Sequence, residues 1–237
     1  MNWKRIARKL GDCRQILKAN AKASYAQVGE DLIVSYLFQA LNIDKPTYLE
    51  IGTNHPIVGN NTFYFYSRGS AGVCVEPDPD MFAIIKAHRP MDVILNMGIG
   101  VNENTHADFF AFPPPYTGWN SFSMKEAEKR QAETGIRIRK VTTLPLISVN
   151  EVMLKYFEPF PNFISLDVEG LDLDIFHSLD FDRFHPEVVC VESVTFSPSG
   201  KGQKISAIGN FLESKGYFAY ADTFVNTIFC RKDKFEK

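Results

Sequence analysis

Short apolar runs alternate with amphipathic helical patterns over most of this chain, and this alternation constrains the fold more than any other feature. The expected strands lie at residues 47–51, 72–76, 92–99, 163–168, 188–193, 217–222 and 227–231. The expected helices lie at residues 29–41, 61–67, 80–88, 149–157, 172–179 and 203–215. Strands that are apolar throughout are buried on both faces, and strand–helix alternation is typical of right-handed crossovers. We therefore expect an α/β fold with a doubly wound, mainly parallel, Rossmann-like sheet and helices on both faces.

The last two expected strands depart from this parallel pattern. Only residues 223–226 separate them. A parallel pair needs a longer crossover connection, so we expect these two strands to pair antiparallel as a hairpin.

Residues 101–145 also interrupt the alternation. They contain an expected strand at 107–112, a proline-rich turn at 113–119 and an exposed polar helix at 125–130. Connections of this length in a compact domain are commonly lids or binding loops. We expect one domain over residues 23–237 with 101–145 as an inserted hairpin and lid. Tyr116, Trp119 and Ser121 are its candidate substrate-binding residues, with the aromatic rings able to stack on a ligand ring. The alternative is a packed hairpin tip.

The first 22 residues form a further unit. They carry seven Lys or Arg and one Asp, a net charge of +6, against −8 for the remainder of the chain. Apolar residues recur among them on one helical face, which predicts a basic amphipathic helix. Such a helix can lie on an anionic membrane surface, or it can pack on the domain or on a second subunit.

Composition excludes several classes of function. A net charge of −2 gives no basic field for nucleic acid. No run approaches the roughly 18 apolar residues that a membrane span needs, and the N-terminus lacks the features of a signal peptide. The four cysteines form no CxxC pair and are expected to be buried thiols of a reducing compartment. We expect a cytoplasmic protein whose contact with the inner face of the membrane, if made, runs through the basic helix.

The candidate ligand site lies beyond the carboxyl ends of the first strands, where open α/β sheets bind their ligands. The first strand ends in Glu50 and Gly52, and Gly52 lets a ligand approach the backbone closely. Asn54 stands where the dinucleotide fingerprint has its second glycine, so we expect no pyrophosphate cradle. Glu76 ends the second strand and is placed to accept hydrogen bonds from ribose hydroxyls.

The third strand supplies the remaining part of this site. Gly98 and Ile99 offer an apolar surface and close backbone for an adenine ring, beside Glu76 and Pro77. Together these features describe a nucleoside without phosphates, next to an acidic turn that suits a cation. S-adenosylmethionine, which has ribose, adenine, an ammonium and a sulfonium, fits this description.

Three carboxylates end the fourth and fifth strands. Asp167, Glu169 and Glu192 should converge on one place and repel one another. A divalent cation on Asp167 and Glu192, a basic side chain, or a raised pKa that makes one carboxylate a general base would compensate the charge. We favour acid–base chemistry or binding of a substrate hydroxyl over a metal. In the structural alternative, Glu169 caps the next helix and Glu192 pairs with Arg or Lys.

His55 is the candidate general base of the first turn. It follows the first strand directly, so we expect it to face the cleft. An imidazole with a pKa of about 6.5 can take a hydroxyl proton near neutral pH. The alternative is a role in a turn or as a helix cap.

These motifs together resemble the FkbM-type S-adenosylmethionine-dependent methyltransferases. The resemblance covers about residues 24–231 and rests on YAQVGED at 25–31, LEIGTNHP at 49–56, NTFY at 61–64, VEPDP at 75–79, FISLDVEG at 163–170 and VCVE at 189–192. It implies a class I methyltransferase fold with strand order 3-2-1-4-5-7-6 and an antiparallel seventh strand. It also implies S-adenosylmethionine as the donor, S-adenosylhomocysteine as the product, and Gln27 and Asp167 among the cofactor-binding residues. Pro56 stands where the class I loop commonly has a second glycine, which leaves the place of the methionine tail open.

Three hypotheses of function follow. The leading one is O-methylation of a sugar hydroxyl, in a glycan or a small secondary metabolite. The second is a nicotinamide-dependent oxidoreductase, against which the missing glycine argues. The third is a non-catalytic scaffold that docks on a membrane through the basic helix, and it predicts no binding of S-adenosylhomocysteine.

Overall fold

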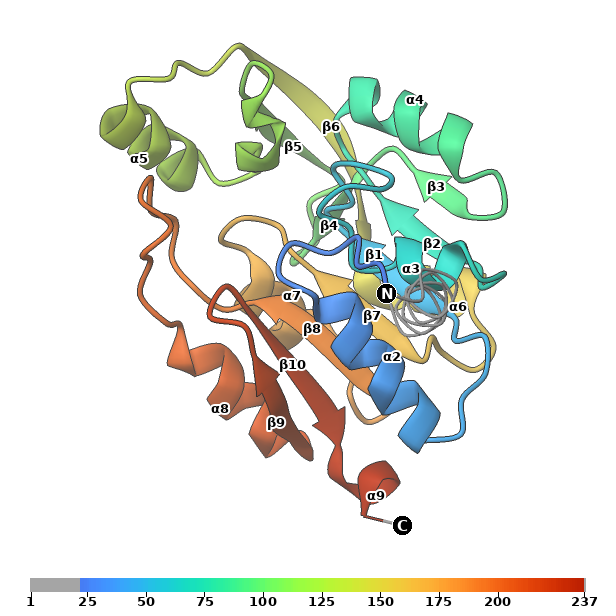
Figure 1. The fold of residues 1–237 in the computed structure, drawn as a ribbon. Coiled ribbons are helices and arrows are strands. Elements are labelled where there is room, and N and C mark those ends of the chain that lie inside the picture. The colour runs from blue at the N-terminus through green and yellow to red at the C-terminus, as the bar shows by residue number, and fades with distance from the viewer. Residues whose placement is uncertain (1–21, 237) are drawn as a thin grey trace, which may run out of the picture.

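A seven-stranded sheet forms the centre of the protein, as a computed structural model that describes residues 22–236 shows (Figure 1). Its strands are β1 (Tyr48–Ile51), β2 (Gly72–Val75), β3 (Val93–Leu95), β7 (Phe163–Leu166), β8 (Val188–Glu192), β9 (Tyr217–Asp222) and β10 (Asn226–Arg231). Their order is β3-β2-β1-β7-β8-β10-β9, which is 3-2-1-4-5-7-6 when the strands of this sheet are counted along the chain. The pairs from β3 to β8 are parallel, and β10 is antiparallel to both β8 and β9. The expected α/β fold, strand order and closing hairpin are confirmed.

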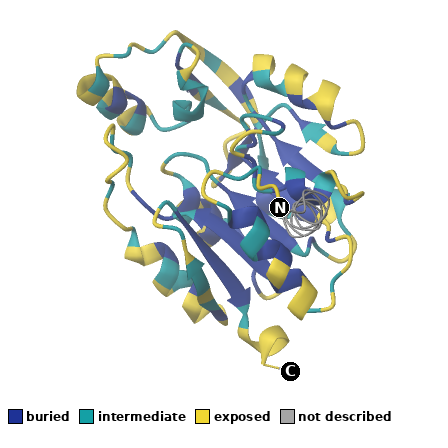
Figure 2. Ribbon diagram, viewed as in Figure 1, coloured by how far each residue is buried: buried dark blue, intermediate teal, exposed yellow. Residues whose placement is uncertain are grey.

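Helices cover both faces of this sheet, because successive side chains of a strand point to opposite sides. On one face, a large apolar core joins the strands to α6 (Val149–Tyr156), α7 (Asp172–Ser178) and α8 (Ser206–Ser214). On the other face, a second core joins them to α2 (Glu30–Ala40) and α3 (Phe63–Tyr66). In Figure 2 the central strands are almost wholly dark blue, the colour of buried residues. Two further helices, α4 (Pro79–His88) and α9 (Lys232–Phe235), follow β2 and β10.

A second sheet of three strands stands beside the first, in the order β4-β6-β5. Its strands are β4 (Gly98–Gly100), β5 (His106–Ala111) and β6 (Lys140–Ser148). The single strand expected at 92–99 is therefore wrong, because the chain leaves the central sheet after β3. At that point the side-chain amide of Asn96 donates to the backbone oxygens of Glu76 and Pro77, both at 2.9 Å.

The inserted segment (residues 101–145) belongs to this second sheet and not to the central one. After β5 come a short helix, η1 (Tyr116–Trp119), and then α5 (Met124–Thr134). The helix expected at 125–130 is present but longer, and it is not exposed throughout, since Ala127 and Arg130 are buried. Whether this segment moves as a lid stays a prediction.

Two further expectations concern the whole chain. Cys74, Cys190 and Cys230 are free and buried, as predicted, whereas Cys13 and most of the basic N-terminal helix lie outside the described residues. Among residues 22–236, no helix has the length and apolar character needed to cross a membrane.

Candidate active site

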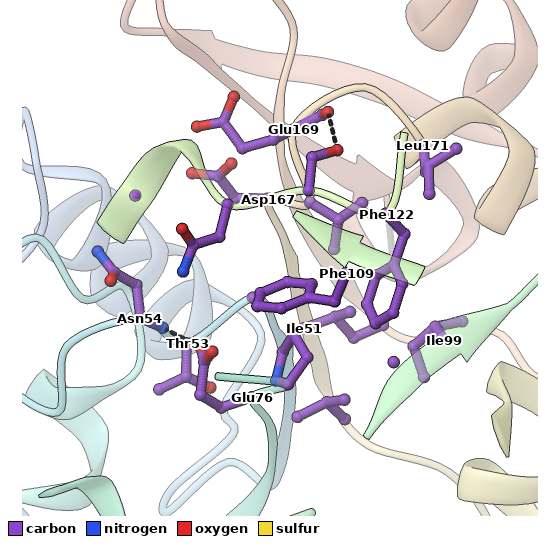
Figure 3. Close-up of a pocket in the computed structure, with 18 of the residues that line it drawn as sticks. Ile51, Thr53, Asn54, Glu76, Ile99, Phe109, Phe122, Asp167, Glu169 and Leu171 are labelled. Carbon is purple, nitrogen blue, oxygen red and sulfur yellow. Dashed lines mark hydrogen bonds between the residues drawn. The ribbon is translucent and has the colours of Figure 1, made fainter. Parts of the chain in front are cut away.

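A cavity lies at the carboxyl ends of β1, β2 and β7, and the inserted segment contributes part of its wall (Figure 3). The predicted site residues that line it are Gly52, Asn54, Glu76, Pro77, Gly98, Ile99, Ser121, Asp167 and Glu169. None of the described residues that line it is Lys, Arg or His. The described lining thus offers no cationic side chain to a phosphate group.

Gly52 is required where β1 meets β7. Its φ is +83°, and a Cβ there would lie 1.8 Å from the backbone oxygen of Asp167. Only glycine lets the two strand ends approach so closely. Glycine is thus required for contact between two strand ends of the protein, and not for the approach of a ligand. This contact keeps Asp167 at the cavity wall.

Glu76 is the buried acceptor of the cavity. Its Oε2 accepts the backbone N–H of Asn54 at 2.7 Å, and its Oε1 accepts that of Asp78 at 2.8 Å. Burial raises the pKa of Glu76 to about 7, although these two backbone donors act in the opposite direction. Each carboxylate oxygen has a second lone pair, so Glu76 can also accept ribose hydroxyls.

An apolar wall completes this part of the cavity. Ile99 lines it together with the rings of Phe109 and Phe122, which lie near each other in Figure 3. A Cβ on Gly98 would fall 2.4 Å from the Phe122 ring, so glycine is what lets that ring reach the backbone. Flat apolar surfaces beside a buried carboxylate fit the adenosine part of S-adenosylmethionine. Sequence analysis missed both aromatic residues.

The carboxylates of Asp167, Glu169 and Glu192 form an acidic cluster in which one oxygen of each lies within 4.8 Å of the others. Burial and the neighbouring carboxylates raise the pKa of Asp167 and of Glu192. Burial also raises the pKa of Glu169, to about 7, against the opposing effect of Arg130. With raised pKa values, these carboxyl groups can share protons, and the cluster can accept or donate one.

The structural alternatives for this cluster are not what the structure shows. Glu169 does not cap α7, whose N-cap residue is Leu171 and whose first turn receives no side-chain cap hydrogen bond. Asp172 organises the loop before α7 by accepting the backbone N–H groups of Val168 at 3.2 Å and Gly170 at 3.3 Å. Glu169 pairs instead with Arg130, whose Nη2 lies 2.5 Å from Oε2. In the described part of the chain, Glu192 forms no ion pair.

Two predicted residues of the first loops lie away from the cavity wall. His55 does not line it, and its Nδ1 accepts the backbone N–H groups of Ile57 at 3.1 Å and Val58 at 2.9 Å. The imidazole thus has the turn role that was the alternative to a general base. Gln27 is exposed and does not line the cavity either.

Glu50 lies on the opposite face of β1 from the cavity-lining Ile51, in a buried polar network. Its Oε2 accepts Arg89 Nη1 at 3.1 Å and Asn60 Nδ2 at 2.9 Å. Arg89 also pairs with Asp92 at 2.7 Å. Sequence analysis missed this network, for which the i, i+3 spacing of Arg89 and Asp92 was the available signal. Glu50 therefore stabilises the loops around the cavity and does not line it.

Of the three candidate substrate-binding residues, the structure brings only Ser121 to the cavity. Tyr116 and Trp119 pack on each other with ring centroids 4.5 Å apart, and Trp119 packs on Phe196 at 5.2 Å. The two aromatic rings thus form a packed hairpin tip, which was the alternative to substrate binding. The residues that contact the cavity loops instead are Thr117, which donates to Asn54 at 3.0 Å, and Asn120, which donates to Asp78 at 3.0 Å.

Comparison with known proteins now adds to this geometry. The family model described as the methyltransferase FkbM domain matches residues 50–219, well over half of the chain. This chain belongs to the FkbM methyltransferase family. The family is one of S-adenosylmethionine-dependent methyltransferases, which decides against the oxidoreductase hypothesis. No curated protein sequence matches this FkbM-family chain.

Several solved structures are similar to it. An O-methyltransferase from Bacillus cereus in complex with S-adenosylhomocysteine is 13% identical, with 93% of this chain and 88% of that chain covered and a TM-score of 0.43. A TehB-like S-adenosylmethionine-dependent methyltransferase from Corynebacterium glutamicum is 11% identical, with 97% and 100% covered and a TM-score of 0.41. Precorrin-6y C5,15-methyltransferase from Geobacter metallireducens is 14% identical, with 90% and 94% covered and a TM-score of 0.41.

Proposed function

We propose that this FkbM-family chain transfers the methyl group of S-adenosylmethionine to a hydroxyl oxygen of a sugar, in a glycan or a small secondary metabolite. The observation that carries the proposal is the position of the acidic cluster. Asp167 and Glu169 line the same cavity as Glu76, and Glu192 lies within 4.8 Å of them. A donor site and proton-accepting groups therefore share one space.

In the donor half, we assign the ribose to Glu76 and the adenine to the apolar wall of Ile99, Phe109 and Phe122. Glu76 is fixed by two backbone donors, so its orientation does not depend on the ligand. Asp167, at the end of β7, is placed to bind the cationic end of the donor. Bound S-adenosylmethionine supplies an electrophilic methyl group.

In the acceptor half, the acidic cluster takes the proton that the attacking hydroxyl loses. Glu169 suits this role because its pKa is about 7, so its carboxylate is present near neutral pH and can also hold a proton. Burial and the neighbouring carboxylates raise the pKa of Glu192, so its carboxyl group can hold a proton and donate a hydrogen bond to another hydroxyl of the acceptor. Placing donor and acceptor side by side supplies the rest of the rate.

The charge of the site supports an uncharged polyhydroxyl acceptor. Carboxyl groups accept and donate hydrogen bonds to sugar hydroxyls, and they repel phosphate or carboxylate groups. Arg130 and the shared protons offset the charge of the cluster, so this scheme requires no divalent cation. Contact of the basic residues 1–22 with a membrane or a second subunit stays a prediction.

Two measurements test the proposal together. Calorimetric titration should show that the protein binds S-adenosylhomocysteine but does not bind NAD⁺. Incubation with deuteromethyl-labelled S-adenosylmethionine and a panel of methyl hexosides and oligosaccharides should give a labelled methyl ether, located by tandem mass spectrometry. A labelled amine product would overturn the hydroxyl acceptor, and absence of adenosylhomocysteine binding would overturn the donor site and favour the scaffold hypothesis.

A further inference from the structure

Arg130 is the cation of the acidic cluster, and it comes from the inserted segment. Its side chain is 1% exposed, although it belongs to a charged run whose other members lie mostly at the surface of α5. A buried guanidinium is strongly destabilising unless it is paired and hydrogen-bonded, so a fully buried Arg needs a specific partner. Its ion-pair partner among the described residues is Glu169.

The contacts of Arg130 fix its position on three sides. Nη2 lies 2.5 Å from Oε2 of Glu169, and Nη1 donates to the backbone oxygen of Trp119 at 2.8 Å. The guanidinium carbon lies 5.0 Å from the ring centre of Phe196, in the loop after β8. These partners come from η1, from the loop after β7 and from the loop after β8.

The backbone of Glu169 is held as firmly as its side chain. Its φ is +60°, in the left-handed region that non-glycine residues rarely adopt. Such a conformation persists only where the surroundings impose it. The backbone oxygen of Glu169 accepts Ser121 Oγ at 3.2 Å and Arg130 Nη2 at 3.5 Å. Both donors belong to the inserted segment.

A second contact seats α5 on the same loop. Gly170 has a φ of +107°, and a Cβ there would lie 2.8 Å from Cγ of Glu126 on α5. Loop 167–172 and α5 therefore fit together at neighbouring positions. The carboxylates and cations that surround Glu169 are Glu126, Arg130, Asp167, Asp172 and Glu192.

We propose that Arg130 is a positioning residue, which holds Glu169 in its left-handed conformation with its carboxylate toward Asp167 and Glu192. The inserted segment thereby supplies the cation that completes the acidic cluster as well as part of the cavity wall. The role of this contact in methyl transfer rests on the proposed function, whereas the contact itself does not. A residue that only stabilised α5 would have no effect on loop 167–172 or on the chemical step.

Hydrogen exchange tests the contact without any ligand. In Arg130→Met, we expect the amides of loop 167–172 to exchange roughly 10- to 100-fold faster, because a charge-assisted hydrogen bond is lost. Arg130→Lys should restore most of the protection. Arg139→Met is the matched control, since Arg139 lies in the same inserted segment with its side chain 40% exposed, and it should leave the loop unchanged.

A double-mutant cycle keeps the test decisive if Arg130→Met folds poorly. Glu169→Gln removes the partner charge and should loosen the same loop, and combining it with Arg130→Gln, which removes the cation but keeps a polar side chain, should add little to either single change. Native exchange rates in Arg130→Met, or fully additive effects in the cycle, would overturn the proposal.

Kinetics with the best acceptor of the methyl hexoside panel tests the consequence for catalysis. Arg130→Met should lower kcat by roughly 10²-fold with the KM for S-adenosylmethionine within about twofold, and Arg130→Lys should recover part of kcat. An unchanged kcat would overturn the positioning role. Failure of the native protein to bind adenosylhomocysteine would count against the proposed function alone, because the exchange experiment uses no ligand.

Discussion

His55 Nδ1 accepts the backbone N–H of Val58 at 2.9 Å, a hydrogen bond that closes the turn after β1. The lone pair of Nδ1, with which a general base would take a proton, is therefore already used by the turn. The sequence placed His55 correctly in the first turn after the strand. It could not show which way the ring points, because the turn itself sets that direction. For this reason the proposed mechanism assigns the proton acceptor to the acidic cluster and not to His55.

His55→Asn tests this assignment. The Asn side-chain oxygen can accept the same backbone N–H groups but cannot take a proton near neutral pH. We expect turnover within about threefold of native, whereas loss of a general base costs roughly 10²–10⁴-fold. Labelled-methyl transfer across pH 6 to 9 is the measurement. A loss of a hundredfold or more in a folded variant would return the base to His55.

Removal of divalent cations tests how the acidic cluster is compensated. Because Arg130 and shared protons offset its charge, we expect methyl transfer to continue in EDTA, and Mn²⁺ titrated into the protein should give no bound signal in electron paramagnetic resonance. Activity lost in chelator and regained with Mg²⁺ or Mn²⁺ would make Asp167 and Glu192 metal ligands instead.

The pH dependence of stability follows from Glu76 and Glu169. Burial raises the pKa of each to about 7, from 4.5 without burial. Between about pH 4.5 and 7 the native state thus binds more protons than the unfolded state, so the free energy of unfolding falls as pH rises through this window. Urea unfolding should give a higher value at pH 5 than at pH 8. Glu76→Gln should flatten this trend, and a free energy of unfolding that stays constant or rises between pH 5 and pH 8 would contradict the raised pKa values of these groups in the native state.

Periodicity predicted the central sheet well, because apolar strands and amphipathic helices each follow one pattern along the chain. Other features depended on long-range partners. Glu50 and Glu76 are both acidic residues near strand ends, but only Glu76 lines the cavity. Glu50 points to the other face of β1, where it binds Arg89, 39 positions away in the sequence. The split between β3 and β4 depends on the hydrogen bonds of Asn96 to Glu76 and Pro77.

The acidic cluster was predictable in part, because the order of the strands could be predicted. Asp167, Glu169 and Glu192 follow neighbouring parallel strands, so topology alone brings them together. The sequence does not single out Arg130, because a run of Lys, Glu and Arg gives no sign of which member is buried. Its partner, Glu169, lies 39 positions away and reaches it only after the inserted segment has packed on the loop after β7.

The central claim is that the cavity binds the methyl donor through Glu76, and calorimetric titration with S-adenosylhomocysteine tests it most directly. The native protein should bind one equivalent, and Glu76→Ala should bind about 10- to 100-fold more weakly, because a hydrogen bond to a charged group is worth roughly 1.5–3 kcal/mol. Asp80→Ala is a suitable control, since Asp80 is exposed on α4 and does not line the cavity. Absence of binding to the native protein, or unchanged affinity in a folded Glu76→Ala variant, would contradict the account.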